Sequence, residues 1–252
     1  MRVLNLQRHS GPYNMALDQA LFEEYREESS PVIRFYGWNK PTLSLGYFQR
    51  SSRFKFLENH GDIGLVRRLT GGRGVIHHLE LTYSFIAGYD DLFQGSDLIG
   101  SYSIISDIFK RSFNDLGVEI GVEKVKRGAN SDNCFEAPSL YEIKLDKYKV
   151  IGSAQYRKGG KFLQHGSIIL DVDYDVFEEV FKISRERMTK AVKGINSITG
   201  ENFTVCQIAD EIKKVLSEKF RLDESVPTEK ELKRAEELVS SRYSSKDWTF
   251  KR

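Results

Sequence analysis

The sequence predicts an α+β fold with a mixed, largely antiparallel sheet flanked by helices. Short apolar or alternating runs, typical of strands, recur through the first 90 residues. Three more such runs between residues 140 and 170 are separated by tight turns. Helical periodicity with capping signals then dominates after residue 174. Strands that come first, with helices interleaved and then trailing, indicate an α+β domain.

In the N-terminal half, the residue pattern alternates between strands and helices. A helix is expected near residues 97–116, because Tyr102, Ile105, Phe109 and Phe113 fall on one face and Gly117 is a stop signal. The other expected helices cover residues 13–27 and 52–60, and the expected strands cover residues 1–6, 31–38, 42–47, 63–66 and 81–86.

The C-terminal half is expected to hold a meander followed by helices. Residues 123–133 are polar and predict a loop that ends at Cys134. Strands are expected at 140–145, 148–156 and 162–170, with turns at Asp146-Lys147 and at residues 158–161. A short helix is predicted at 174–182, and capping boxes predict two more: Thr204 with Gln207 starts 204–220, and Thr228 with Glu231 starts 228–243.

Length and composition predict one substantial core. With 252 residues and 40% apolar content, we expect one main domain over residues 1–221 and a helical C-terminal tail, 222–252, packed on the same domain. The net charge of +2 gives no strong field for nucleic acid, although local basic clusters remain candidate docking sites for an acidic protein. No long apolar run is present, so we expect a cytoplasmic protein without a membrane partner.

The stretch Arg67–His78 combines three Arg, three Gly and two His between two predicted strands. Glycines let the backbone approach a ligand closely, and Arg supplies fixed donors to an anion or a carbonyl group. A basic hairpin loop with turn glycines explains the same composition. No phosphate-binding loop or dinucleotide motif matches this spacing.

Two cysteines, Cys134 and Cys206, are too few and too far apart for a disulfide framework, and no spacing predicts a metal site. Cys134 lies between a polar loop and a strand, where a nearby cation would make it a nucleophile. The alternative is a small buried apolar residue. For Cys206, which lies at the start of a predicted helix beside apolar residues, we expect an unreactive thiol.

Lys149 opens a strand in which alternate residues Lys149, Ile151 and Ser153 are expected to share one face, beside small residues Gly152 and Ala154. Such a Lys either faces a ligand channel or is simply solvated. His165 lies in the middle of the next strand, beside a Gly, and is either a satisfied core His or part of a site.

Taken together, these segments resemble the lipoate/biotin protein ligase and octanoyltransferase superfamily, from about residue 1 to 250. The resemblance rests on Arg34–Trp38 with Leu43–Gln49, on the Gly-rich stretch Arg67–His77, and on Lys149–Gln155 followed by Gln164–Ser167. It implies a biotin/lipoate ligase-like catalytic domain in which the Gly-rich stretch binds the acyl group.

Within this superfamily, the chain is most similar to the cysteine-dependent octanoyltransferases of Gram-positive type. Lipoate ligases typically carry Gly where Arg73 stands and an Asn-Asp pair where Asn133-Cys134 falls. The resemblance implies transfer of octanoate from acyl carrier protein to a lysine of the glycine cleavage H protein, through a Cys134 thioester and without a cofactor. An ATP-dependent lipoate ligase, an octanoyl amidotransferase that takes its acyl group from H protein, and a non-enzymatic scaffold remain alternatives.

The same resemblance implies roles for individual residues. Cys134 would attack the octanoyl thioester, and Lys149 would stabilise the thiolate and the developing oxyanion or accept a proton. The predicted substrate-binding residues are Arg67, Gly71, Gly72, Arg73, His77, Gly152, Ser153 and His165.

Overall fold

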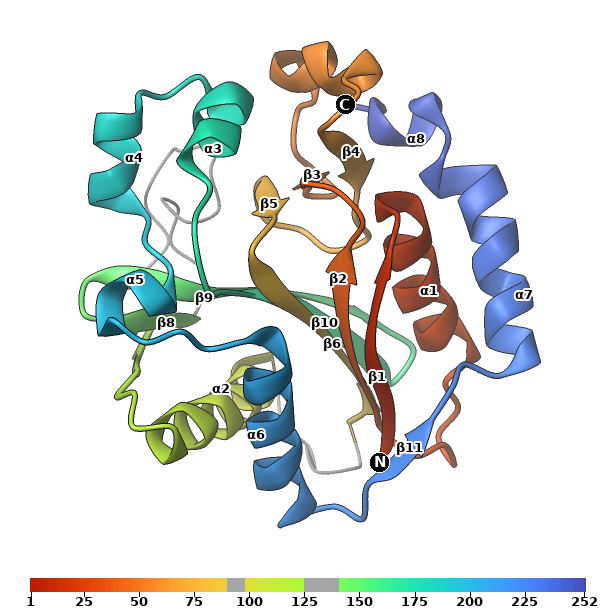
Figure 1. Cartoon of the computed structure of the whole chain (residues 1–252). Helices are drawn as coiled ribbons and strands as arrows, with labels where there is room; N and C mark the ends of the chain where they lie inside the picture. Colours follow the sequence, from red (N-terminus) through yellow and green to blue (C-terminus); the bar gives the residue numbers. More distant parts are fainter. Residues whose placement is uncertain (90–97, 125–140) are drawn as a thin grey trace.

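Among the residues that the structure describes, eight strands form one large mixed sheet that runs through the molecule (Figure 1). The computed structural model describes residues 1–89, 98–124 and 141–252. The strand order is β11-β1-β2-β6-β10-β9-β8-β7. β1 pairs in parallel with β2 and β11, and every other neighbouring pair is antiparallel. The predicted α+β class with a mixed, largely antiparallel sheet is therefore confirmed.

The predicted meander is present as three consecutive antiparallel strands, β8, β9 and β10. Its turns need left-handed backbone, which Asp146 (φ 53°), Gly159 (φ 60°) and Gly160 (φ 72°) supply. The strands of the large sheet are β1 (Arg2–His9), β2 (Val32–Trp38), β6 (Glu80–Gly88), β7 (Gly121–Lys124), β8 (Tyr141–Leu145), β9 (Tyr148–Lys158), β10 (Lys161–Ile169) and β11 (Asp223–Ser225).

A second, smaller sheet has the order β4-β3-β5, with β4 (Gly64–Arg67) parallel and β5 (Val75–His77) antiparallel to β3 (Thr42–Leu45). β5 corrects the sequence prediction, which placed these residues in a loop: three residues are too few to show a period of two. The predicted loop at 123–133 is also wrong at its start, because Glu123 belongs to β7 and pairs with Glu142, a distant partner that local composition does not reveal.

Helices cover both faces of the large sheet (Figure 1). Alternate β2 residues divide between the two cores: Ile33 and Phe35 pack with α2 and α6, whereas Val32 and Tyr36 pack with α1 and α7. The main helices are α1 (Gly11–Glu24), α2 (Leu98–Asp115), α6 (Val205–Ser217) and α7 (Glu229–Leu238). The capping boxes predicted for α6 and α7 are both confirmed.

A third core joins the small sheet to η1 (Ser52–Asn59), α3 (Tyr174–Phe181) and α4 (Arg185–Ala191). The remaining short helices are α5 (Ile195–Thr199), η2 (Val239–Tyr243) and α8 (Lys246–Thr249). In the described part of the chain, no helix combines the length and the apolarity needed to cross a membrane.

The segment after residue 222 lies against the rest of the chain. β11 extends the large sheet beside β1, and α7 runs along α1. Farther on, the backbone carbonyl of Thr249 accepts a hydrogen bond from Arg67 of β4. The division at residue 221 stays a prediction.

Candidate functional site

A pocket of about 360 Å³ empty volume opens between the two sheets and α1. It brings together four predicted site residues from three separate segments: His77 of β5, Gly152 and Ser153 of β9, and His165 of β10. The other lining residues are Met15, Tyr36, Ser44, Arg68, Val75, Thr82, Ala154, Gly166 and Ser167.

The floor of this pocket depends on two glycines on neighbouring strands. Gly152 lies opposite Ser167, and Gly166 lies opposite Ser153. A Cβ added to Gly166 would come within 2.5 Å of the Gly152 carbonyl oxygen and 2.7 Å of the Tyr83 ring. Gly166 is therefore required for strand contact at this point, which explains the glycine beside His165 in the sequence.

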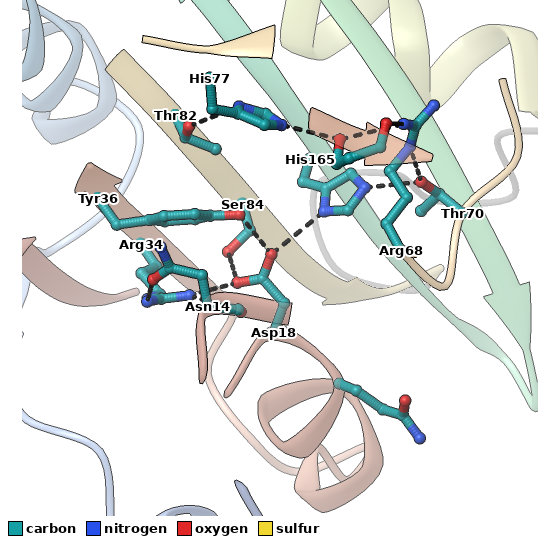
Figure 2. A network of polar contacts seen from close by, with 12 residues as sticks. Asn14, Asp18, Arg34, Tyr36, Arg68, Thr70, His77, Thr82, Ser84 and His165 are labelled. Carbon is teal, nitrogen blue, oxygen red and sulfur yellow. Dashed lines mark hydrogen bonds and ion pairs between the residues drawn. The ribbon is translucent and has the colours of Figure 1, made fainter. Parts of the chain in front are cut away.

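Asp18 lies at the centre of a buried polar network beside the pocket (Figure 2). Its Oδ1 accepts hydrogen bonds from Arg34 at 2.8 Å and Ser84 at 2.9 Å. Its Oδ2 accepts from the Tyr36 hydroxyl at 2.7 Å and contacts His165 Nδ1 at 3.2 Å. Four partners compensate the burial of this carboxylate.

The charges in this network fix the protonation of Asp18 and His165. Burial alone would raise the pKa of Asp18, but the hydrogen bond with His165 and the charge of Arg34 hold it below its usual value. Burial lowers the pKa of His165, despite the opposing effect of Asp18. His165 is therefore neutral at physiological pH, and Asp18 selects the tautomer in which Nδ1 carries the hydrogen.

The other ring nitrogen of His165 reaches the Gly-rich stretch. Nε2 lies 2.6 Å from Thr70 Oγ1, so the Thr70 hydroxyl donates to the neutral ring. Thr70 Oγ1 also accepts from Arg68 Nε at 3.2 Å. Hydroxyl, imidazole and carboxylate are arranged as in a catalytic triad. However, Thr70 is fully buried and does not line the pocket, so the arrangement positions the Gly-rich stretch instead.

Arg68 holds the Gly-rich stretch from within. Its Nη2 donates to the backbone carbonyls of Gly71 and Arg73, and its Nη1 donates to Ser44. Gly72 needs its left-handed φ of 90° here. The Gly-rich stretch also contacts the turn that follows β3, because the Tyr47 N–H donates a hydrogen bond to the Thr70 carbonyl.

His77 forms the second imidazole of the pocket. Its Nε2 lies 2.9 Å from Ser44 Oγ, and its ring stacks on Trp38 with centroids 4.1 Å apart. Trp38 in turn donates to Thr82 Oγ1. His77 is 6% exposed, so it is a fixed wall of the pocket.

Arg67 differs from its neighbour Arg68 in what it binds. It is fully buried, and its Nη1 donates to the backbone carbonyls of Gly46, Tyr47 and Gln49 while its Nε donates to Thr249. Burial lowers the pKa of Arg67 to about 10. These contacts give Arg67 a structural role, and its contact with substrate stays a prediction.

Gly71, Gly72 and Arg73, predicted to bind substrate, lie at the edge of the site and are not among the pocket-lining residues. Lys149 does not line the pocket either; its Nζ lies 3.5 Å from Glu142 Oε1 on the adjacent strand β8, and its side chain is 3% exposed. Lys149 and Ile151 were expected to point to the same face of the sheet. A register shift between β8 and β9 falls between these two residues and interrupts the regular alternation of side chains.

Cys134, the predicted nucleophile, lies outside the described residues. Glu142, the partner of Lys149, follows it by eight positions in the sequence. In the described part of the chain, no group of three or more His, Cys, Asp or Glu is placed to hold a metal ion.

Sequence reasoning missed Asp18, Ser44, Arg68 and Thr82. Asp18 gave one signal: a charged residue among apolar neighbours, Met15-Ala16-Leu17 before it and Ala20-Leu21-Phe22 after it. Because α1 is buried on almost every side from Asn14 to Phe22, no polar face of the helix marked the position as unusual.

This pocket lies on a fold shared with solved lipoate ligases. A putative lipoate protein ligase from T. acidophilum superimposes with a TM-score of 0.82 at 22% identity, covering 100% of this chain and 98% of that one. A lipoate-protein ligase A bound with ATP superimposes with a TM-score of 0.80 at 23% identity, covering 99% and 97%. At these identities the likeness shows the fold alone.

The sequence relationship is closer. Residues 10–222 match the lipoyl protein ligase A/B catalytic domain, and the chain belongs to that family. Within it, the chain is similar over almost its full length to octanoyltransferase LipM of Halalkalibacterium halodurans, at 38% identity and 95% coverage of both chains. LipM of Bacillus subtilis is also 38% identical, with 96% of this chain and 95% of the relative covered. The chain is thus an acyltransferase of the octanoyltransferase type, in lipoate biosynthesis.

Proposed function

We propose that this enzyme takes an octanoyl group from octanoyl-acyl carrier protein, holds it as a thioester on Cys134, and passes it to a lysine of a lipoyl-domain protein. The acceptor we propose is the glycine cleavage H protein. Similarity to the LipM octanoyltransferases supports the octanoyl group as cargo. The observation that carries the proposal is the narrow pocket, which joins four of the predicted substrate-binding residues.

The reaction balances without ATP. In the first step, the Cys134 thiolate attacks the thioester carbonyl, a new C–S bond forms, and the carrier's thiolate leaves and takes up a proton. In the second step, the amine of the acceptor lysine attacks the acyl-enzyme, an amide forms, and the Cys134 thiolate is released. One proton leaves the amine during this step. A thioester is already activated, so neither step needs a cofactor.

We assign to Lys149 the role of stabilising the negative charge that develops on the carbonyl oxygen of the thioester. Its ammonium is buried and held beside Glu142, in a place where a fixed positive charge acts through little solvent. It would stabilise the Cys134 thiolate before attack and the oxyanion during it. Farther along the same strand, by three and four residues, Gly152 and Ser153 line the pocket.

Intact mass spectrometry tests the proposal. Incubation with octanoyl-acyl carrier protein should add one octanoyl group, and Cys134→Ala should abolish the adduct. The matched control is Cys206→Ala, which removes an exposed cysteine on α6 and should leave the adduct intact. A wild-type enzyme that acquires no adduct overturns the proposal.

Two related activities are separated by the same assay. An ATP-dependent lipoate ligase would modify the acceptor in the presence of lipoate and ATP, and this activity would survive Cys134→Ala. An octanoyl amidotransferase would accept octanoyl-H protein as donor in place of octanoyl-acyl carrier protein. Comparison of the initial acylation rates with both donors decides between the two branches.

A further inference from the structure

One strongly exposed aromatic side chain, Phe48, lies close in sequence to the residues of the site. Phe48 is 67% exposed, although large apolar rings are usually covered. It lies in the turn that follows β3, four positions after the pocket residue Ser44. A lone exposed ring needs no explanation. This ring differs because the turn that carries it is rigidly held and surrounded by positive charge.

Arg67 fixes the shape of the turn. Its Nη1 binds the carbonyls of Gly46, Tyr47 and Gln49, on both sides of Phe48 in the sequence. On the other side, the Gly46 backbone presses against the Gly-rich stretch: a Cβ added there would lie 1.9 Å from the Gly72 carbonyl oxygen. The backbone that carries Phe48 is therefore already ordered. A partner that binds this ring would cause only a small further loss of conformational entropy in the turn.

Cations surround this turn. The Arg252 guanidinium lies 5.1 Å from the Phe48 ring, and the Arg252 carbonyl accepts hydrogen bonds from Ser51. Arg50 and Arg53 are exposed on the chain that continues into η1, where the Arg53 guanidinium also donates to the backbone carbonyl of Phe181. We name Phe48, Arg50, Arg53 and Arg252 the Phe48 surface.

Acidic residues are sparse in the segments that form and support the Phe48 surface: η1 and α8 each hold one, Glu58, which pairs with Lys246, and Asp247. Residues 39–57, 63–78 and 248–252 contain no Asp or Glu, although 36 of these residues occur in the whole chain. The Nζ of Lys251 lies 3.2 Å from the centre of the Tyr47 ring. Burial, followed by the charges of Arg67 and Arg252, lowers the pKa of Lys251 to about 8. Basic residues therefore predominate around this turn even though the net charge of the chain is only +2.

We propose that the Phe48 surface is the docking site for the acidic carrier protein that delivers the acyl thioester. The proposal rests on the function proposed above. An aromatic anchor among arginines is the composition typical of binding hot spots. The carrier also joins its acyl-bearing arm through a phosphodiester, a fixed anion that guanidinium groups bind well and that an acceptor lysine does not offer. These features favour the donor over the acceptor.

The test compares a protein donor with a small one. The variants are Phe48→Ala and the double charge reversal Arg50→Glu with Arg53→Glu. The matched control is Lys219→Glu with Arg221→Glu, the same charge change at exposed residues after α6, at the other end of the molecule from β3 (Figure 1). Acylation of the enzyme is followed by intact mass, with octanoyl-acyl carrier protein or with uncharged octanoyl-N-acetylcysteamine.

With the carrier protein, we expect the charge reversal to lower kcat/KM by about tenfold or more and to flatten its dependence on salt, because rim charges act on association. With octanoyl-N-acetylcysteamine, both variants should stay within about twofold of wild type, as should the control with either donor. Equal losses with both donors would overturn the proposal, since these residues would then serve the reaction centre or the fold.

Two further measurements separate this proposal from the proposed function. Direct titration of carrier protein reports docking without chemistry: wild-type enzyme that binds the carrier but is not acylated contradicts the function, whereas variants that bind as wild type contradict the docking site. Transfer from preformed acyl-enzyme to the acceptor protein isolates the second step. A charge-reversal variant slowed only in that step would assign the Phe48 surface to the acceptor and overturn the proposal.

Discussion

His165 donates its Nδ1 hydrogen to Asp18 across 3.2 Å, linking the pocket wall to the centre of helix α1. The two residues are 147 positions apart in the chain, and both are buried. Through Thr70 on the other ring nitrogen, it holds the Gly-rich stretch in place. The stability of the site and the position of its Gly-rich stretch therefore depend on one carboxylate.

Asp18→Asn should destabilise the protein strongly. The substitution leaves the buried Arg34 guanidinium without its charged partner, and breaking a buried pair in this way costs about 3–5 kcal/mol. Urea unfolding measures the change. Asp115→Asn is the control, because its ion pair with Lys214 is exposed and should contribute less than about 1 kcal/mol. An unchanged unfolding midpoint for Asp18→Asn would show that the network is not stabilising.

Stability should fall on mild acidification because of His165. Its folded-state pKa is below the ordinary value of 6.5, so between these two pKa values the unfolded chain binds a proton that the folded chain does not. Unfolding free energy is then fully retained above about pH 6.5 and decreases below it. Denaturant titrations at several pH values should show a flatter profile for His165→Gln. His9, whose pKa burial also lowers, accounts for part of any slope that remains.

Gly46→Ala should disturb the site, whereas Gly71→Ala should not affect the fold. An added methyl group on Gly46 meets the Gly72 carbonyl, and such overpacking costs about 1–3 kcal/mol or more. Around Gly71 there is open space within 4 Å. Thermal unfolding compares the two variants. If Gly71→Ala raises the KM for the acyl donor without changing stability, direct contact between Gly71 and substrate is supported; equal destabilisation by both would contradict the geometry.

Arg67→Lys should loosen the turn before η1 together with residues near the C-terminus. Lysine keeps the charge but cannot bind Thr249 and three carbonyls of the turn at once. We expect a loss of about 2–4 kcal/mol, since bonds from charged donors contribute about 1.5–3 kcal/mol each. Hydrogen exchange should rise at residues 47–50 and 248–252, while Arg50→Lys, at an exposed position, leaves it unchanged.

The sequence was sufficient for the fold class and the main helices and strands because their signals are local, whereas the short strands β5 and β7 were missed. Alternation in the meander and the capping boxes at Thr204 and Thr228 act within a few residues, and the structure confirms them. The site depends on longer contacts. Nothing near Asp18 indicates that it meets His165, and nothing near Arg67 distinguishes its backbone contacts from those of Arg68. Such pairings arise only when the sheets bring distant segments together.

The contact between Arg67 and Thr249 spans 182 positions of the chain. During synthesis, the turn that carries Phe48 is translated early, but its support is completed only after residue 249 has left the ribosome. A growing chain can therefore form much of the sheet while this turn still lacks part of its final support. A chain that stops before residue 249 lacks the carbonyl that Arg67 Nε binds, so we expect such a truncation to loosen the turn that carries Phe48.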